Sequence, residues 1–233
     1  MKILEFVQAV HYHDTLNPKL WSGMILRQEV RSKLMTIADD FKKFIALPNI
    51  KIKDITISGS NASYGYGEHS DIDLHLVVSM GDDPTLRALF DAKKNNYNFN
   101  HKITLNGIDV EVYVQDSEQK HHSAGIYSVL DNRWLSKPKH TVPKVTDKEV
   151  RSKARNYSSM INKAIKSDDL NTVTDVLADL KRLRQAGLDA GGEFSVENLA
   201  YKLLRSRGSI DKLYRHQQRL KNIKLSLENR NED

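Results

Sequence analysis

Residues 55–78 read ITISGSNASYGYGEHSDIDLHLVV and decide the fold of the first half of the chain. A short apolar run ends at Gly59-Ser60, and a second apolar run follows the pair Asp71 and Asp73. This pattern predicts two strands joined by a flexible polar loop. Because alternate residues of a strand face the same side, the two aspartates share a face and lie roughly 6.5–7 Å apart along the strand. Two carboxylates on a rigid strand, beside a loop able to approach a phosphate, predict a site for a divalent cation and a nucleoside triphosphate.

A hairpin further along the chain supplies a third carboxylate. Residues 102–114 read KITLNGIDVEVYV, and Asn106-Gly107 is the dipeptide that a two-residue type I′ turn prefers. In the second arm the apolar residues share one face, which we expect in the core, while Asp109 and Glu111 share the other. Glu111 is the preferred third carboxylate because it lies mid-strand, where its position is best fixed. Asp109 lies nearer the turn and stays the alternative.

The remaining segments predict helices around this sheet. Apolar residues recur at three- and four-residue intervals over residues 20–47, which predicts one amphipathic helix. Pro84 suits the first turn of a helix that runs to about Lys94, and residues 95–100 are expected to form a loop. Trp21 and Trp134 are expected to pack in the interior.

The last part of the chain is expected to be entirely helical. Asp168 or Asp169, and also Ser195, are plausible N-caps, and Gly187 and Gly208 are plausible helix ends. The predicted helices cover residues 147–166, 169–186, 195–206 and 209–228.

Composition excludes several classes of protein. The 233 residues are 39% hydrophobic and 28% charged, as expected of a globular chain, and they include no cysteine. Disulfides, thiolate catalysis and cysteine-ligated zinc are therefore excluded. No apolar run reaches the roughly 18–20 residues that a membrane span needs, and the N-terminus shows no signal-peptide pattern. We therefore expect a cytoplasmic protein.

The net charge of +6 is unevenly distributed, because most of the basic excess falls after residue 146. The stretch Lys202–Lys224 holds eight basic residues and a single acidic one, Asp211. Such a stripe can attract a polyanion, although a solvated helix face would look the same.

The combination of Gly59-Ser60, a spacer, Asp71-Ile-Asp73-Leu74 and a later strand carboxylate resembles the polymerase-β-type nucleotidyltransferase superfamily. The resemblance covers about residues 35–115. It implies an α+β fold in which a nucleotidyltransferase core, with a mixed β-sheet and flanking helices, precedes an all-helical C-terminal domain. The implied divisions are a catalytic core with its N-terminal helix (1–118), a connector (119–146) and the helical domain (147–233).

The resemblance also implies roles for individual residues. Gly59 and Ser60 would hold the triphosphate of an NTP. Asp71, Asp73 and Glu111 would coordinate two divalent ions, Mg²⁺ or Mn²⁺. The implied reaction transfers a nucleoside monophosphate to an acceptor hydroxyl and releases pyrophosphate.

The chain departs from the family pattern at one point. Many relatives place an arginine a few residues after Gly-Ser, whereas residues 61–64 contain no basic side chain. Lys93, Lys94, Lys102 or the basic C-terminal helices would have to supply the cation for the triphosphate. Tyr64 and Tyr66 in the same loop would either stack on a base or pack the loop.

The basic stripe favours RNA as the acceptor. The residues expected to bind it are Arg205, Arg207, Arg215 and Arg219. A small-molecule or protein acceptor, of the antibiotic-modifying, AMPylating or toxin type, stays open, as does a catalytically silent nucleic-acid-binding relative. A membrane partner is not expected.

Overall fold

The computed structural model divides the chain into two compact units, Met1–Val142 and Pro143–Asp233. The residues that the structure describes are 13–47, 50–68, 70–119, 123–140 and 145–226. The first unit is a mixed α+β structure and the second is helical, so the α+β fold class is confirmed.

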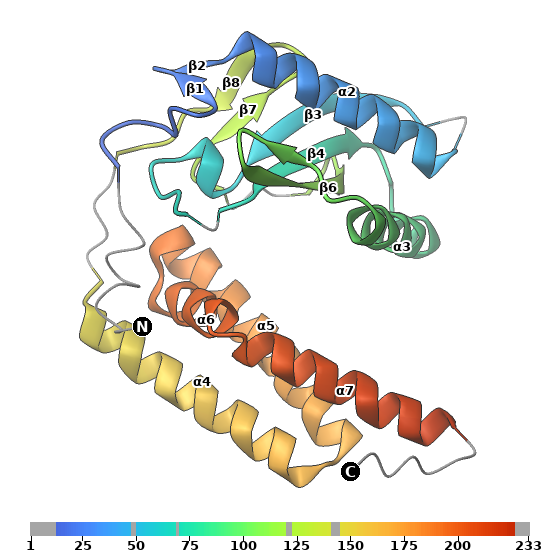
Figure 1. Cartoon of the computed structure of the whole chain (residues 1–233), viewed down its shortest axis with the longest axis vertical. Helices are drawn as coiled ribbons and strands as arrows, with labels where there is room; N and C mark the ends of the chain where they lie inside the picture. The colour runs from blue at the N-terminus through green and yellow to red at the C-terminus, as the bar shows by residue number, and fades with distance from the viewer. Residues whose placement is uncertain (1–12, 48–49, 69, 120–122, 141–144, 227–233) are drawn as a thin grey trace. The chain divides into compact units, whose positions relative to one another are not determined.

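The first unit is built on a six-stranded sheet with the order β5-β6-β4-β3-β7-β8 (Figure 1). β4 and β6 pair in parallel and the other neighbours are antiparallel. The strands are β3 (Ile52–Ser58), β4 (Ile72–Val78), β5 (Thr104–Leu105), β6 (Ile108–Asp116), β7 (Ile126–Ser128) and β8 (Arg133–Ser136).

One face of the sheet forms the core, as the alternating sequence predicts. Ile57, Leu74 and Val112 are almost completely buried on adjacent strands, and their sequence neighbours face the other way. The turn of the β5–β6 hairpin has positive φ angles at both Asn106 and Gly107, 52° and 76°, as a type I′ turn requires. The predicted hairpin is therefore confirmed.

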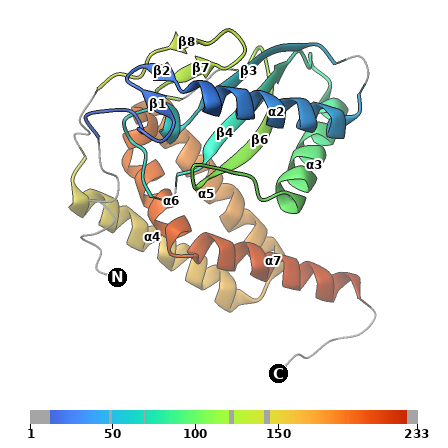
Figure 2. The same cartoon turned by 45° about the horizontal axis from the view of Figure 1, so that its top comes forward.

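Helix α2 (Gln28–Ile45) lies over the core face of the sheet (Figures 1 and 2). Its buried residues follow the predicted three- and four-residue spacing, but the helix begins eight residues later than expected. The preceding segment forms a small ribbon of β1 (Trp21–Ser22) and β2 (Ile25–Leu26), turning at Gly23, which has a φ of 60°. The positive φ at Gly23 is incompatible with a right-handed helix that continues toward residue 20.

Helix α3 (Pro84–Asn100) runs beside β6 and extends past Lys94 through the stretch expected to be a loop. Tyr97 explains the extension, because its ring packs 4.9 Å from that of Phe41 and its hydroxyl donates to Asp40. At the next residue, the side-chain amide of Asn98 donates to the carbonyl of Val112 and accepts from its N–H. These tertiary contacts hold a polar segment that has little helix preference of its own.

The segment after β6, predicted as a connector from residue 119, contains β7 and β8, which extend the sheet beyond β3. Trp134 of β8 stacks on Trp21 with ring centroids 4.8 Å apart, and Tyr127 of β7 meets Trp21 edge-on at 5.0 Å. Both tryptophans therefore have the packing role that was predicted for them.

The second unit contains four long helices. Thr146 and Glu149 form a capping box at the start of α4, and Asp169 and Ser195 cap α5 and α6 as predicted. Gly187 does not end a helix, because α5 runs on to Gly191. The helices are α4 (Asp147–Ser167), α5 (Leu170–Gly191), α6 (Val196–Ser206) and α7 (Ser209–Leu225), with a short η2 (Gly192–Phe194) before α6.

Gly187 has a packing role instead. A Cβ at this position would lie 2.6 Å from the Cβ of Glu197 and 2.9 Å from the Ser195 hydroxyl oxygen. The glycine therefore lets the first turn of α6 pack closely against α5. Among the described residues, no helix is both long enough and apolar enough to span a bilayer.

Candidate active site

A row of polar side chains crosses three adjacent strands on the sheet face opposite the core. Ser58 of β3 pairs in register with Asp73 of β4, which in turn pairs with Glu111 of β6. Register partners on adjacent strands point to the same face, and neighbouring strands lie about 4.7–4.9 Å apart. Asp71 precedes β4 by one residue, and the strand alternation places it on this face as well. We call Asp71, Asp73 and Glu111 the carboxylate row.

The register separates the two candidates for the third carboxylate. Glu111 lies opposite Asp73 and is half-buried, whereas Asp109 is exposed and pairs with Thr104 across the hairpin. The geometry therefore brings Glu111, and not Asp109, beside Asp73.

Gly59 follows the last residue of β3, and its backbone lies directly against the carboxylate of Asp73. Its backbone has a φ of 75° and ψ of −159°, a conformation that is essentially limited to glycine. A Cβ at this position would overlap Asp73 Oδ2, so the absence of a side chain leaves the space that the carboxylate occupies. The Gly59 N–H donates to Ser123 Oγ at 2.8 Å.

The segment after Gly59 is a single 3₁₀ turn, η1 (Ser60–Ala62), rather than a freely flexible loop. The Ser60 hydroxyl donates to Ser70 Oγ at 2.9 Å, and that same oxygen accepts from the Gly67 N–H. These hydrogen bonds join the start of the loop, at Ser60, to its end at Ser70, the residue before Asp71.

Asn61 anchors this turn, although the sequence pattern gave it no role. Its buried amide donates to the carbonyls of Ser70 and Asp71, at 3.1 and 2.8 Å, and accepts from the Asn17 amide. The Trp21 indole N–H donates to the Asn61 carbonyl at 2.8 Å. Asn61 thereby orients the backbone that leads into the carboxylate row.

Tyr113 lies one row further along β6, and its hydroxyl donates to Glu111 Oε2. Burial raises the pKa of Tyr113 well above 10, and the charges of Asp73, Glu111 and Asp71 raise it further. All three carboxylates therefore act on one phenol, which remains a protonated hydrogen-bond donor at neutral pH. A glutamate and a tyrosine two residues apart on one strand face are the sequence signal that could have identified it.

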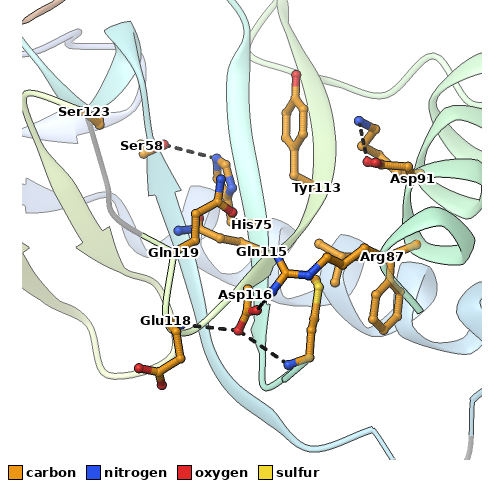
Figure 3. Close-up of a pocket in the computed structure, with 14 residues that line it drawn as sticks. Ser58, His75, Arg87, Asp91, Tyr113, Gln115, Asp116, Glu118, Gln119 and Ser123 are labelled. Atoms are coloured by element: carbon orange, nitrogen blue, oxygen red, sulfur yellow. Dashed lines mark hydrogen bonds and ion pairs between the residues drawn. The ribbon is translucent and has the colours of Figure 1, made fainter. Parts of the chain in front are cut away.

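His75 completes this second row between Thr56 and Tyr113. Its Nε2 lies 3.1 Å from Ser58 Oγ, and its ring stacks on Tyr113 with centroids 5.0 Å apart (Figure 3). The imidazole of His75 and the phenol of Tyr113 thus form the row next to the carboxylate row, and the imidazole contacts the Ser58 hydroxyl.

The candidate cations differ in where the structure places them. Lys94 lies over the Tyr113 ring, 5.3 Å from its centroid. Lys93 instead contacts α2, with its Nζ 3.4 Å from the Phe44 carbonyl oxygen and 5.4 Å from the centre of that ring. Lys102 is exposed in the segment between α3 and β5. Of the three lysines, Lys94 is the one directed at the sheet face that bears the carboxylates.

The arginines predicted to bind RNA all lie in the second unit and are exposed. Arg219 forms an ion pair with Asp168 at 2.5 Å. The others are Arg205 on α6, Arg207 at its C-cap and Arg215 on α7.

The two loop tyrosines, Tyr64 and Tyr66, contact other side chains of the same unit. Tyr66 stacks on His13 with centroids 3.9 Å apart, and the Tyr64 hydroxyl donates to Met24 Sδ while its ring meets His140 edge-on. In this arrangement they pack the loop, which was one of the two predicted roles.

The carboxylate row has the donor chemistry that a divalent cation such as Mg²⁺ requires. Its three side chains supply hard oxygen ligands, and Gly59 leaves room for the Asp73 carboxylate. Among the described residues, however, no three acidic or histidine side chains are arranged to hold a metal, and Glu111 accepts the Tyr113 hydrogen bond. The ligand type and the strand register therefore fit a divalent ion. To bind it, Glu111 would have to give up the hydrogen bond from Tyr113.

Comparison with known proteins adds little to this geometry. Models of known protein families give no match, and neither do curated protein sequences. One solved structure that matches is a STING-associated CdnE c-di-GMP synthase from Capnocytophaga granulosa, at 13% identity and a TM-score of 0.27. The match covers 94% of this chain and 87% of that one. A TM-score this low does not establish a shared fold.

Proposed function

We propose that the first unit is a metal-dependent nucleotidyltransferase that moves a nucleoside monophosphate from an NTP to an acceptor hydroxyl. The observation that carries the proposal is the pairing of Asp73 with Glu111 on parallel strands, with Gly59 directly against Asp73. A glycine turn, two alternate aspartates and a carboxylate on the next strand are the parts that this chemistry needs in one place.

In the proposed reaction the acceptor oxygen attacks the α-phosphorus of the NTP. A new oxygen–phosphorus bond forms, the bond to the oxygen bridging the α- and β-phosphates breaks, and pyrophosphate leaves with the electron pair. Glu111 accepts the proton of the attacking hydroxyl, and Ser60 with the Gly59 turn binds the triphosphate. Divalent ions bound at the carboxylate row would neutralise phosphate charge and lower the pKa of the acceptor hydroxyl.

The positively charged partner of the triphosphate is proposed to be Lys94, in place of the arginine found in relatives. Its position over Tyr113 supports this role, whereas Lys93 is engaged with Phe44. Lys94 also pairs with the exposed Asp91 at 3.3 Å, a contact that it would exchange for the triphosphate. Binding of RNA by the exposed arginines of the second unit stays a separate proposal.

A labelling assay tests the proposed activity. Purified protein with Mg²⁺ is incubated with a crude host extract and each of the four NTPs, labelled at the α- or the γ-phosphate. We expect α-label and no γ-label to enter an extract component, and the double variant Asp71→Ala/Asp73→Ala to abolish the transfer. Transfer of γ-label, or α-transfer that survives the double change, would reject the proposal. A catalytically silent protein would give no transfer and no NTP binding by calorimetry.

A further inference from the structure

A pocket of about 630 Å³ opens between the sheet and α3 (Figure 3). Ser58, His75 and Tyr113 line it on the sheet side, and Lys94 and Asp91 of α3 line it opposite. Ser58 is the register partner of Asp73, and the Tyr113 hydroxyl donates to Glu111, so two of the lining residues adjoin the carboxylate row.

The size of the pocket is that of a small-molecule site. Clefts that enclose small ligands typically have volumes of about 300–1,000 Å³. The described lining comes from β3, β4, α3, β6 and the residues after β6, all of which belong to the first unit.

The charges around the pocket are unfavourable for a polyanion. The part of its lining that the structure describes contains two basic and three acidic side chains. Arg87 pairs with the buried Asp116 at 2.7 Å, and Lys94 pairs with Asp91 at 3.3 Å, so both cations already have carboxylate partners. Glu118 adds a further negative charge. A nucleic-acid backbone depends on lysine and arginine side chains that are free to bind it. Of the two basic side chains in the described lining, Arg87 pairs with a buried carboxylate and Lys94 is the one proposed to bind the triphosphate, so neither is left for such a backbone.

The uncharged part of the lining suits a ligand with hydroxyl groups and an apolar face. Ser58, Ser123 and Gln119 supply hydrogen-bonding groups at one side, and Met80 and Phe90 supply apolar surface near α3. Pockets for small ligands combine apolar walls with a few placed polar groups in this way.

We propose that this pocket binds the acceptor, and that the acceptor is a small polyhydroxylated molecule without net negative charge, rather than RNA. The inference rests on the proposed nucleotidyl transfer. One hydroxyl of the bound molecule would lie toward the carboxylate row and form the new bond to the α-phosphorus. Its proton would pass to Glu111 and pyrophosphate would leave.

The experiment compares two adjacent exposed positions on α3. Asp91→Trp fills the pocket from its rim, whereas Ala92→Trp adds the same bulk at a position that does not line it. Each variant and the wild type receive α-labelled NTP and Mn²⁺ with either the extract fraction below about 1 kDa or the purified RNA fraction. Calorimetry measures NTP binding in parallel, and adenosine, AMP, glucosamine and glucosamine 6-phosphate are added as competitors.

We expect the wild type and Ala92→Trp to label the small-molecule fraction within twofold of each other. Asp91→Trp should label it at least tenfold less, although its NTP affinity is not weakened, because the change removes the carboxylate that pairs with Lys94 and leaves the lysine in place. Adenosine or glucosamine should compete better than its phosphorylated counterpart. Label in RNA alone, equal transfer by Asp91→Trp, or better competition by the phosphorylated compounds would overturn the acceptor assignment while the proposed function stands. Failure of the wild type to bind NTP would instead reject the proposed function, and the acceptor site with it.

Discussion

The α-carbon of Gly59 faces the carboxylate of Asp73 so closely that position 59 has no room for a side chain. The end of β3 and the start of the carboxylate row are thus fitted to each other across the strand pair. This contact ties the Gly-Ser turn to the acidic site more directly than their spacing in the sequence does.

Gly59→Ala should therefore impair both folding and activity. The strained backbone conformation alone should lower the free energy of unfolding by about 1–3 kcal/mol. The displaced Asp73 should lower nucleotidyl transfer at least tenfold. Urea unfolding and the labelling assay measure the two effects.

Gly81→Ala is the matched control, because Gly81 also has a positive φ, 57°, but a Cβ there would meet no atom within 4 Å. It should lose some stability and keep its activity. Equal losses of activity in the two variants would contradict the role given to the Gly59–Asp73 contact.

The third carboxylate is tested by two variants on the same strand face. Glu111→Gln should lower the transfer rate about 100-fold or more, the scale expected when charge stabilisation at a reacting group is lost. Asp109→Asn should stay within about threefold of the wild type, because Asp109 lies at the hairpin and is exposed. The reverse ranking would assign the role to Asp109.

The hydrogen bond from Tyr113 to Glu111 should compete with metal binding. Tyr113→Phe removes the donor and frees the glutamate, so Mn²⁺ should bind several-fold more tightly in calorimetry, given the strength of hydrogen bonds to charged groups. Phe90→Leu, a change in a nearby ring without a hydroxyl, serves as the control. Unchanged or weaker Mn²⁺ binding in Tyr113→Phe would show that the hydrogen bond from Tyr113 does not compete with the metal for Glu111.

Asn61→Asp tests the anchor of the Gly-Ser turn. The replacement keeps the shape but sets a carboxylate against two backbone carbonyls, those of Ser70 and Asp71. The free energy of unfolding should fall by about 2–4 kcal/mol, as when a buried polar group loses its partners. Asn95→Asp, at an exposed position on α3, should change it little. Equal free energies of unfolding of the two variants in urea would contradict the anchoring role given to Asn61.

A pH-dependent contribution to stability is expected in the second unit. The hydrogen bond from Lys153, at 3.0 Å, lowers the pKa of Glu197 from its ordinary value of 4.5. A depressed pKa in the folded state means that the stabilisation is present above the ordinary value and is lost as the pH falls through the folded one. Glu197→Gln should therefore lower the Tm at pH 7 and make little difference at about pH 3. An equal effect at both pH values would contradict the assignment, and Glu68→Gln, at an exposed position, is the control.

Local sequence patterns were sufficient for the parts of the fold that short-range physics determines. The alternation around Asp73 predicted β4, the Asn106-Gly107 turn predicted the hairpin, and the N-caps of α5 and α6 were predicted from single residues. These features depend on a few neighbouring positions, so the sequence shows them directly.

What the sequence did not show depends on contacts between distant segments. Asn61 acquires its role from contacts with Asn17 and Trp21, which lie 44 and 40 positions away in the sequence. Lys93 and Lys94 look equivalent until the packing of α3 directs one toward α2 and the other toward Tyr113. The pocket likewise forms only where α3, the end of β6 and the following residues come together.

The stoichiometry of the released phosphates tests the central claim most directly. ³¹P NMR should follow purified protein, Mg²⁺, NTP and the acceptor fraction, for the wild type and for Asp71→Ala/Asp73→Ala. We predict one pyrophosphate for each nucleotide transferred by the wild type, and neither product in the double variant. Orthophosphate as the product, or pyrophosphate release that persists without the two aspartates, would contradict a nucleotidyl-transfer site at the carboxylate row.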